Sequence, residues 1–213
     1  MVSFTSVLVA SAALASTALA QRTIQVLAVQ DLTLEDTFVF KPNTFTAAVG
    51  DTIEFHFAPT GFLPSNHSVA QGTFESSCTP MPNGFFSGFV PAMPKATPPD
   101  PVTPDTELGE APKVFRVPVR TTNPMVFYCA TAEHCTRGMY AVVNPSNTQN
   151  LASYKALIKK YGPAVAPLAV AGGQMVDNPG VVNPPLTEAG AMKLPTASAI
   201  AMTGAIAFAL LLA

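Results

Sequence analysis

The chain has 213 residues, of which 48% are hydrophobic and only 11% charged, with 21 prolines, 3 cysteines and no tryptophan. This length allows one or two domains. The formal charge of −2 offers no basic surface, so a nucleic-acid partner is not expected. The composition also excludes a coiled coil, a collagen-like chain, a disulfide-dense miniprotein and a membrane protein with several spans.

The N-terminal segment 1–20 has no charged side chain and ends in Ala18-Leu19-Ala20. A short apolar segment followed by an Ala-x-Ala site is typical of a secretory signal peptide. We therefore expect cleavage after Ala20 and a mature chain that begins at Gln21. The alternative is an N-terminal membrane anchor.

The C-terminal segment 191–213 ends in an uncharged apolar run, and small residues precede it. This order is typical of the signal for a GPI anchor, in which the apolar tail is removed and a lipid is attached. We expect attachment at Ala189 or Gly190, so that the lipid is the only link to the membrane. The alternative is a tail-anchored helix.

Short strand-like segments fill the first part of the mature chain, over residues 23–57. In residues 53–57, alternation places three apolar side chains on one face and Glu54 and His56 on the other. The pattern therefore predicts that His56 faces solvent and is not a metal ligand.

Residues 91–112 are rich in proline and acidic side chains, which predicts an exposed excursion because proline removes the N–H that a sheet ladder needs. Strand-like segments resume at 114–119, 124–129 and 139–143. Repeated short strands with turn residues, and no helix between them, predict an all-β Greek-key sandwich or barrel that spans 21–145.

A different pattern follows this all-β domain. Apolar residues at helical spacing within 146–162 predict one amphipathic helix that packs on the sandwich, with Asn147 capping its start and Gly162 its end. Residues 163–190, rich in Pro, Ala, Gly and Val, predict a spacer that leads to the anchor.

The candidate chemistry lies in a C-x4-H-x4-M motif formed by Cys129, His134 and Met139, with a second histidine, His67, upstream. A thiolate, two imidazoles and a thioether form a soft donor set, which suits copper, whereas carboxylates would suit magnesium or calcium. Two His and one Cys with a long axial Met is the arrangement of electron-transfer copper sites. The candidate ligands of one copper ion are therefore His67, Cys129, His134 and Met139.

The odd number of cysteines needs an explanation in a secreted protein, where thiols normally pair. Pairing of Cys78 with Cys135 would leave Cys129 free as a ligand. Pairing of Cys129 with Cys135 would destroy the candidate site.

These motifs together resemble the phytocyanin-type cupredoxins, in particular the fungal cell-surface members with a signal peptide and a GPI tail. The resemblance covers about residues 23–144, with a longer proline-rich insertion at 91–112 than in plant members. It implies a cupredoxin-like β-sandwich, one type 1 copper, and a disulfide that joins the two non-ligand cysteines. The motifs that carry it are Asn66-His67-Ser68-Val69, Cys78, Phe127-Tyr128-Cys129, His134-Cys135 and Gly138-Met139.

Asn66 has two interpretations. Asn66-His67-Ser68 is an N-glycosylation sequon, which would need Asn66 to be exposed. Alternatively, the Asn66 amide bonds the loop of Cys129 and fixes ligand orientation, as residues behind metal ligands commonly do. The family resemblance favours the second interpretation.

The functional hypothesis is a blue copper protein of the outer cell surface, held there by its GPI lipid, that carries single electrons or handles copper. It would be a monomer and not an enzyme, and its redox partner is unknown. The alternative is a structural or adhesive cell-wall protein on a cupredoxin scaffold. A hydrolase with Cys129 as nucleophile and His134 as base is disfavoured, because the sequence shows no third orienting residue and no oxyanion loop.

Overall fold

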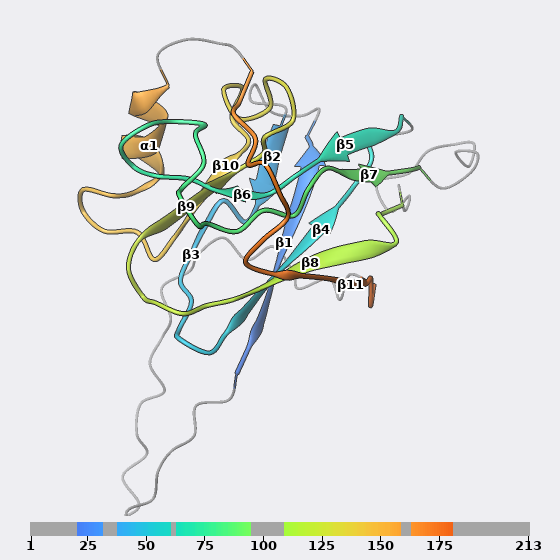
Figure 1. Cartoon of the computed structure of the whole chain (residues 1–213), viewed down its shortest axis with the longest axis horizontal. Helices are drawn as coiled ribbons and strands as arrows, with labels where there is room; N and C mark the ends of the chain where they lie inside the picture. The colour runs from blue at the N-terminus through green and yellow to red at the C-terminus, as the bar shows by residue number, and fades with distance from the viewer. Residues whose placement is uncertain (1–20, 32–37, 61–62, 95–108, 159–162, 181–213) are drawn as a thin grey trace, which may run out of the picture. The chain divides into compact units, whose positions relative to one another are not determined.

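Two main β-sheets, one two-stranded sheet and one helix make up the computed structural model, which describes residues 21–31, 38–60, 63–94, 109–158 and 163–180 (Figure 1). A five-stranded sheet has the order β11-β8-β4-β1-β2, a four-stranded sheet the order β3-β10-β9-β6, and β5 pairs with β7 alone. The elements are β1 (Thr23–Gln30), β2 (Phe38–Lys41), β3 (Thr44–Phe45), β4 (Thr52–Phe57), β5 (Ser65–His67), β6 (Ala70–Gln71), β7 (Val90–Ala92), β8 (Lys113–Pro118), β9 (Met125–Tyr128), β10 (Tyr140–Val143), α1 (Leu151–Leu157) and β11 (Gln174–Asp177). The predicted all-β sandwich with one helix is therefore confirmed.

Both predicted targeting segments, 1–20 and 191–213, lie outside the described residues, as do Ala189 and Gly190. Residues 95–108 of the proline-rich insertion 91–112 also lie outside the described residues. Within the described ranges, no helix has the length and the apolar character needed to cross a bilayer.

The main core lies between the two sheets and is built largely of aromatic rings. The ring of Phe127 on β9 lies edge to face against Phe55 on β4, at 4.9 Å between centroids, and against Phe40 on β2, at 5.0 Å. All three side chains are at most 1% exposed. Burial of a side chain of this kind contributes about 1.5–3 kcal/mol, so the aromatic contacts hold the sheets face to face.

The four-stranded sheet is buried on both faces. Along β9, Phe127 enters the main core while its neighbours Val126 and Tyr128 enter a second apolar cluster on the opposite face. This cluster includes Tyr154 from α1, whose side chain is fully buried. Double burial explains why β10 is a continuous apolar run and not an alternating one.

The helix α1 starts three residues later than the sequence pattern predicts. Asn150, not Asn147, is its N-cap: the Asn150 side chain accepts from the Ser153 N–H, and the Ser153 hydroxyl oxygen accepts from the Asn150 N–H. This reciprocal pair is a capping box, which satisfies two N–H groups that a helix start leaves unpaired. The predicted cap at Gly162 lies outside the described residues.

Residues 163–180 are not a spacer; they fold back onto the domain, and we call them the C-terminal strap. At the start of the strap, the Ala164 N–H donates to Ala132 O at 2.7 Å and the Val165 N–H donates to Cys78 O at 3.0 Å. Its last part forms β11, which pairs antiparallel with β8. Backbone hydrogen bonds and strand pairing therefore hold the strap on the domain, although Val165, Leu168 and Val170 stay exposed.

A glycine makes this close packing feasible. A Cβ atom added at Gly173 would lie 2.5 Å from the Phe115 ring and 2.6 Å from Arg116 O. No real Cβ atom comes that close to a backbone oxygen, so any side chain at position 173 would push the strap away from β8.

We predict that Gly173→Ala lowers the free energy of unfolding by about 1–3 kcal/mol, the usual cost of overpacking. Chemical denaturation measures the change. Gly180→Ala is the comparison, because its Cβ would meet nothing within 4 Å and only its positive φ of 88° opposes a side chain. A Gly173→Ala variant as stable as the parent protein would contradict the packing of the strap.

The expected exposure of His56 is wrong. Its side chain is 1% exposed and lies between two carboxylates, with Nε2 2.9 Å from Glu54 Oε1 and Nδ1 3.0 Å from Glu110 Oε2. Arg116 on β8 bonds the other oxygen of Glu54 at 2.6 Å, and Asn178 at the end of the strap donates to Glu110 at 2.8 Å. Simple alternation failed because charged partners, which the strand pattern does not reveal, cover the outer face of β4.

We predict that stability falls as pH rises through the range in which His56 loses its proton. Burial opposes the charge on His56, but the bonds to Glu110 and Glu54 outweigh it and raise the pKa above the ordinary value of 6.5. A raised pKa contributes stability that is complete below the unfolded value and is lost as pH passes the folded value. The free energy of unfolding is measured as a function of pH for both proteins. His56→Gln should reduce the fall in this free energy above pH 6.5. An equal fall in the parent and the variant would contradict the interaction of a charged His56 with Glu54 and Glu110.

Candidate metal centre

The loop between β9 and β10 carries three of the four predicted ligands and is closed by its own backbone. The Cys129 N–H donates to Met139 O at 3.0 Å, and the Met139 N–H donates to His134 O at 2.9 Å. Gly138 has a φ of 115°, a conformation that residues with side chains rarely adopt. The glycine in the motif therefore turns the chain back so that Met139 leads directly into β10.

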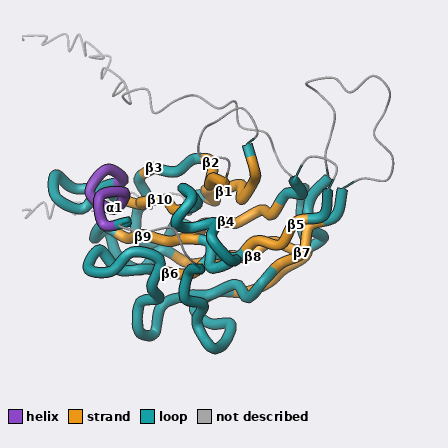
Figure 2. The backbone as a smooth tube through the Cα atoms, turned by 90° about the horizontal axis from the view of Figure 1, so that it is seen from above, coloured by secondary structure: helices purple, strands orange, loops and turns teal. Residues whose placement is uncertain are grey.

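His67 joins this loop from a distant part of the chain. It ends β5, which pairs with β7 at the end of the molecule away from α1 (Figure 2). The potential ligand atoms of His67, Cys129 and His134 all lie within 4.8 Å of one another, and Cys129 Sγ is 3.6 Å from His134 Nδ1. The fold thus brings three of the predicted residues to one point.

Among the residues that the structure describes, the imidazole of His67 has no hydrogen-bond partner. It is fully buried, and neither Nδ1 nor Nε2 is bonded to another group. A buried polar group left unsatisfied costs about 1–3 kcal/mol, so two such atoms on one ring need an explanation. A metal ion at the centre of the three ligand atoms would supply it.

Both imidazoles are kept neutral, which is the form that binds metals. Burial, together with the positive charge that His134 would carry, lowers the pKa of His67 to about 3. Burial and the nearby Arg137 lower the pKa of His134 to about 4. Burial also raises the pKa of the Cys129 thiol, so the thiolate is disfavoured until a cation offsets the cost of burying its charge.

Ser68 bonds both the sulfur of Cys129 and the loop that follows it, whereas one interpretation of the sequence expected Asn66 to bond that loop. The Ser68 N–H donates to Cys129 Sγ at 3.4 Å, and the Ser68 hydroxyl accepts from the Ala130 N–H at 2.8 Å. Asn66 instead points to solvent, because alternation along β5 turns Asn66 outward and His67 inward. A neighbour of His67 therefore bonds the Cys129 loop, but this neighbour is Ser68, which follows His67, and not Asn66, which precedes it.

Met139 lies beside Cys129 and His134, because its carbonyl accepts from the Cys129 N–H and its own N–H donates to His134 O. Its side chain is fully buried in the same core cluster as Cys129. The buried position suits the predicted thioether ligand, which stays a proposal.

A stack of rings on His134 was not predicted from the sequence. The Phe38 ring lies 3.9 Å from the His134 ring with 15° between their planes, and Arg137 Cζ lies 4.9 Å from the Phe38 centroid. Phe38 covers one face of the imidazole and so limits its reorientation. Phe38 belongs to a strand remote in sequence, and no spacing or motif in the chain links it to His134.

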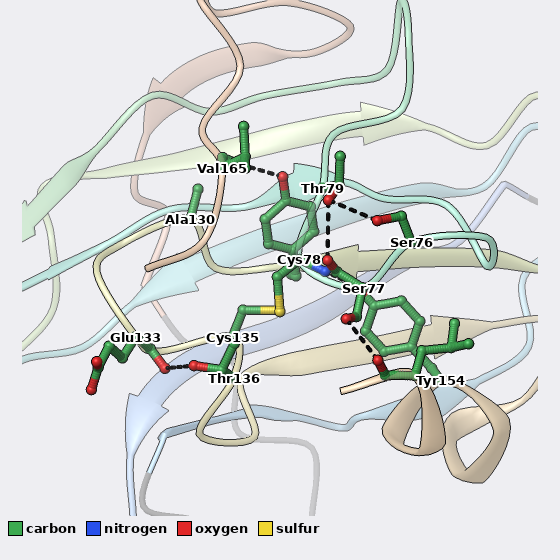
Figure 3. The surroundings of a disulfide bond; sticks show 12 residues. Ser76, Ser77, Cys78, Thr79, Ala130, Glu133, Cys135, Thr136, Tyr154 and Val165 are labelled. Atoms are coloured by element: carbon green, nitrogen blue, oxygen red, sulfur yellow. Dashed lines mark hydrogen bonds between the residues drawn. A yellow bond between two sulfur atoms is a disulfide. The ribbon is translucent and has the colours of Figure 1, made fainter. Parts of the chain in front are cut away.

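The disulfide in the structure joins Cys78 and Cys135 (Figure 3). Cys129 is thereby left as a free, buried cysteine. Cys135 follows His134 directly, so the bridge fixes one end of the ligand loop. Tyr154 of α1 accepts a hydrogen bond from the Cys78 N–H at 2.8 Å. The helix and the bridge therefore support the same side of the metal centre.

We predict that a double variant, Cys78→Ser with Cys135→Ser, loses about 2–5 kcal/mol of unfolding free energy. The closed loop has a sequence separation of 57 residues, for which the chain-entropy model gives about 4 kcal/mol. Denaturation of both proteins measures the loss, and the same experiment in reductant should bring the parent close to the variant. Equal stability under oxidising conditions would contradict a stabilising bridge.

No family model matches the chain. It is 30% identical over 135 residues to a "Probable GPI-anchored cupredoxin-1" of Arthroderma benhamiae, a match that covers 63% of this chain and 60% of that protein. It is 32% identical over 138 residues to an "Extracellular serine-rich protein" of the same organism, which covers 64% of this chain and 46% of that protein. The match thus spans less than two thirds of either relative's length.

Among solved structures, a pseudoazurin from Sinorhizobium meliltoi is similar at 16% identity and a TM-score of 0.36, over 66% of this chain and 94% of that one. The all-β sandwich with its single helix is the fold that the predicted resemblance implies, and in sequence the chain is similar to a protein named as a cupredoxin. Its particular similarity, at 30% identity, is to the curated protein named as a GPI-anchored cupredoxin.

Proposed function

We propose that the protein binds one copper ion through His67, Cys129, His134 and Met139, and that it carries single electrons or handles copper at the outer cell surface. The observation that supports this most is the buried imidazole of His67, whose two unpaired nitrogens lie beside the thiol of Cys129 and the ring of His134. A set of two imidazoles, one thiolate and one thioether matches the preference of copper.

Copper bound there would supply one-electron chemistry by alternating between its two common oxidation states. The chain's own residues hold the donors in place: Ser68 fixes the sulfur of Cys129, and Phe38 fixes the ring of His134. Burial of His67 and Cys129 excludes water from the centre. Such a carrier needs no substrate pocket, so we propose that the protein is not an enzyme.

The proposed location rests on the names of the relatives. One is described as GPI-anchored and the other as extracellular. Together with the predicted signal peptide at 1–20 and the attachment at Ala189 or Gly190, they support a chain that is exported and held outside the plasma membrane by lipid. We propose that it acts there as a monomer that exchanges electrons with a redox partner.

We predict that the purified protein takes up one copper ion per chain and becomes intensely blue through charge transfer from the Cys129 sulfur to copper. Absorption and electron paramagnetic resonance spectra during copper titration provide the measurement. His67→Gln should abolish the colour, whereas His56→Gln, which changes the histidine outside the centre, should keep it. A colourless complex in the parent protein would refute the electron-transfer site and favour the structural or adhesive alternative.

We predict that Met139→Gln keeps the colour and lowers the reduction potential, because a harder axial ligand favours the more highly charged oxidation state. Voltammetry of the copper-loaded protein measures the potential. Met125→Leu is the matched control, since Met125 packs against the same core but lies outside the ligand motif. An unchanged potential in Met139→Gln would show that Met139 is not a ligand.

A further inference from the structure

Asn66 occupies an exposed position for which the fold has no evident use. It lies on β5 between Ser65 and the buried His67, and its own side chain is exposed. Within the described part of the chain, its amide takes part in no hydrogen bond, and Ser68 supplies the bonds to the Cys129 loop. The structure therefore does not support the interpretation in which the Asn66 side chain bonds the Cys129 loop, and the glycosylation sequon is the interpretation that is left.

Asn66-His67-Ser68 is also the only sequon in the 213 residues. An N-glycosylation sequon requires Asn, any residue except proline, and then Ser or Thr. Asn144-Pro145-Ser146 fails because of its proline.

An apolar strip faces solvent on the strand that pairs with β5. Phe89, Pro91 and Met93 alternate with the buried Val90 and Ala92, and we call these three exposed residues the β7 strip. Phe89 is 49% exposed and Met93 is 61% exposed. Phe89 and Met93 flank β7 on either side of Pro91, so these exposed side chains offer an apolar surface that another group can cover.

The sheet register places Asn66 beside this strip. Asn66 pairs directly with Pro91 on β7. Directly paired residues point to the same face, and diagonal neighbours such as Phe89 and Met93 lie only about 7–8 Å away. A sugar attached to the Asn66 amide would lie within reach of all three apolar side chains.

We propose that Asn66 carries an N-linked glycan whose first sugar lies over the β7 strip. In the transfer, the Asn66 amide nitrogen loses a proton and bonds the anomeric carbon of an N-acetylglucosamine. The bond from that carbon to the pyrophosphate of a polyprenyl-linked oligosaccharide donor breaks, and the lipid pyrophosphate leaves. The proposal depends on the secretory route proposed above and not on the copper centre.

The structure also fixes when the transfer occurs. Ser68, the third residue of the sequon, is fully buried, and its hydroxyl is bonded to the Ala130 N–H. A transferase that must engage this serine reaches it only before the β9–β10 loop closes over it. Glycosylation therefore precedes folding and any loading of the metal centre.

The first experiment expresses the full chain in a eukaryotic host and examines medium and cell extract with and without peptide:N-glycosidase F. We expect a loss of mass on treatment and an aspartate at position 66 in the released peptide. Asn66→Gln should lack the glycan, while Ser68→Thr, which keeps both the sequon and a hydroxyl, and Asn123→Gln, outside any sequon, should retain it. An unmodified Asn66 in both medium and extract would overturn the proposal.

The second experiment tests the contact with the β7 strip. Enzymatic removal of the glycan from the folded protein should increase binding of a hydrophobic fluorescent dye, and Phe89→Ser should reduce that increase. A glycosylated protein whose dye binding does not change on treatment would overturn the contact. The copper spectrum of Asn66→Gln should match that of the parent, so failure of the glycan proposal and failure of the copper proposal give different results.

Discussion

A buried imidazole is costly when both of its nitrogens lack a partner, which is the condition of His67 within the described part of the chain. Its strand, β5, belongs to neither main sheet, and the β9–β10 loop brings Cys129 and His134 against it. The unsatisfied ring costs about 1–3 kcal/mol. Packing, the disulfide and the backbone bonds of the ligand loop must together exceed this cost, because without them the ring would turn toward water.

The support for the ligand loop comes from three separate parts of the chain. The disulfide fixes Cys135, the helix α1 places Tyr154 under the bridge, and the strap bonds Ala132. The disulfide is covalent and the Tyr154 side chain is fully buried, whereas the strap contributes a backbone hydrogen bond nearer the surface. A loop supported in this way would suit the proposed copper ion, because donors held in place need little rearrangement when the charge of a bound ion changes.

The sequence predicted the features that depend on local pattern or on a fixed spacing. The sandwich followed from short strands and turn residues, and the grouping of Cys129 with His134 followed from their position on one loop. The sequence did not predict the burial of His56, the packing of the strap or the bonds that Ser68 makes to the Cys129 loop. Each of these features depends on partners that are distant in sequence. Charged residues cover His56, and the strap packs against β8 at Gly173. Asn66 and Ser68 lie on either side of His67, yet Asn66 is exposed whereas Ser68 faces the Cys129 sulfur.

The pairing of β11 with β8 has a practical consequence for where the domain ends. A fragment that stopped at residue 162 would lack the outermost strand of the five-stranded sheet and expose the unpaired backbone groups of β8. An exposed edge strand can pair with a strand of another molecule, which promotes aggregation. A soluble recombinant fragment must therefore extend at least through Asn178, whose N–H still bonds Pro112 O beside the start of β8.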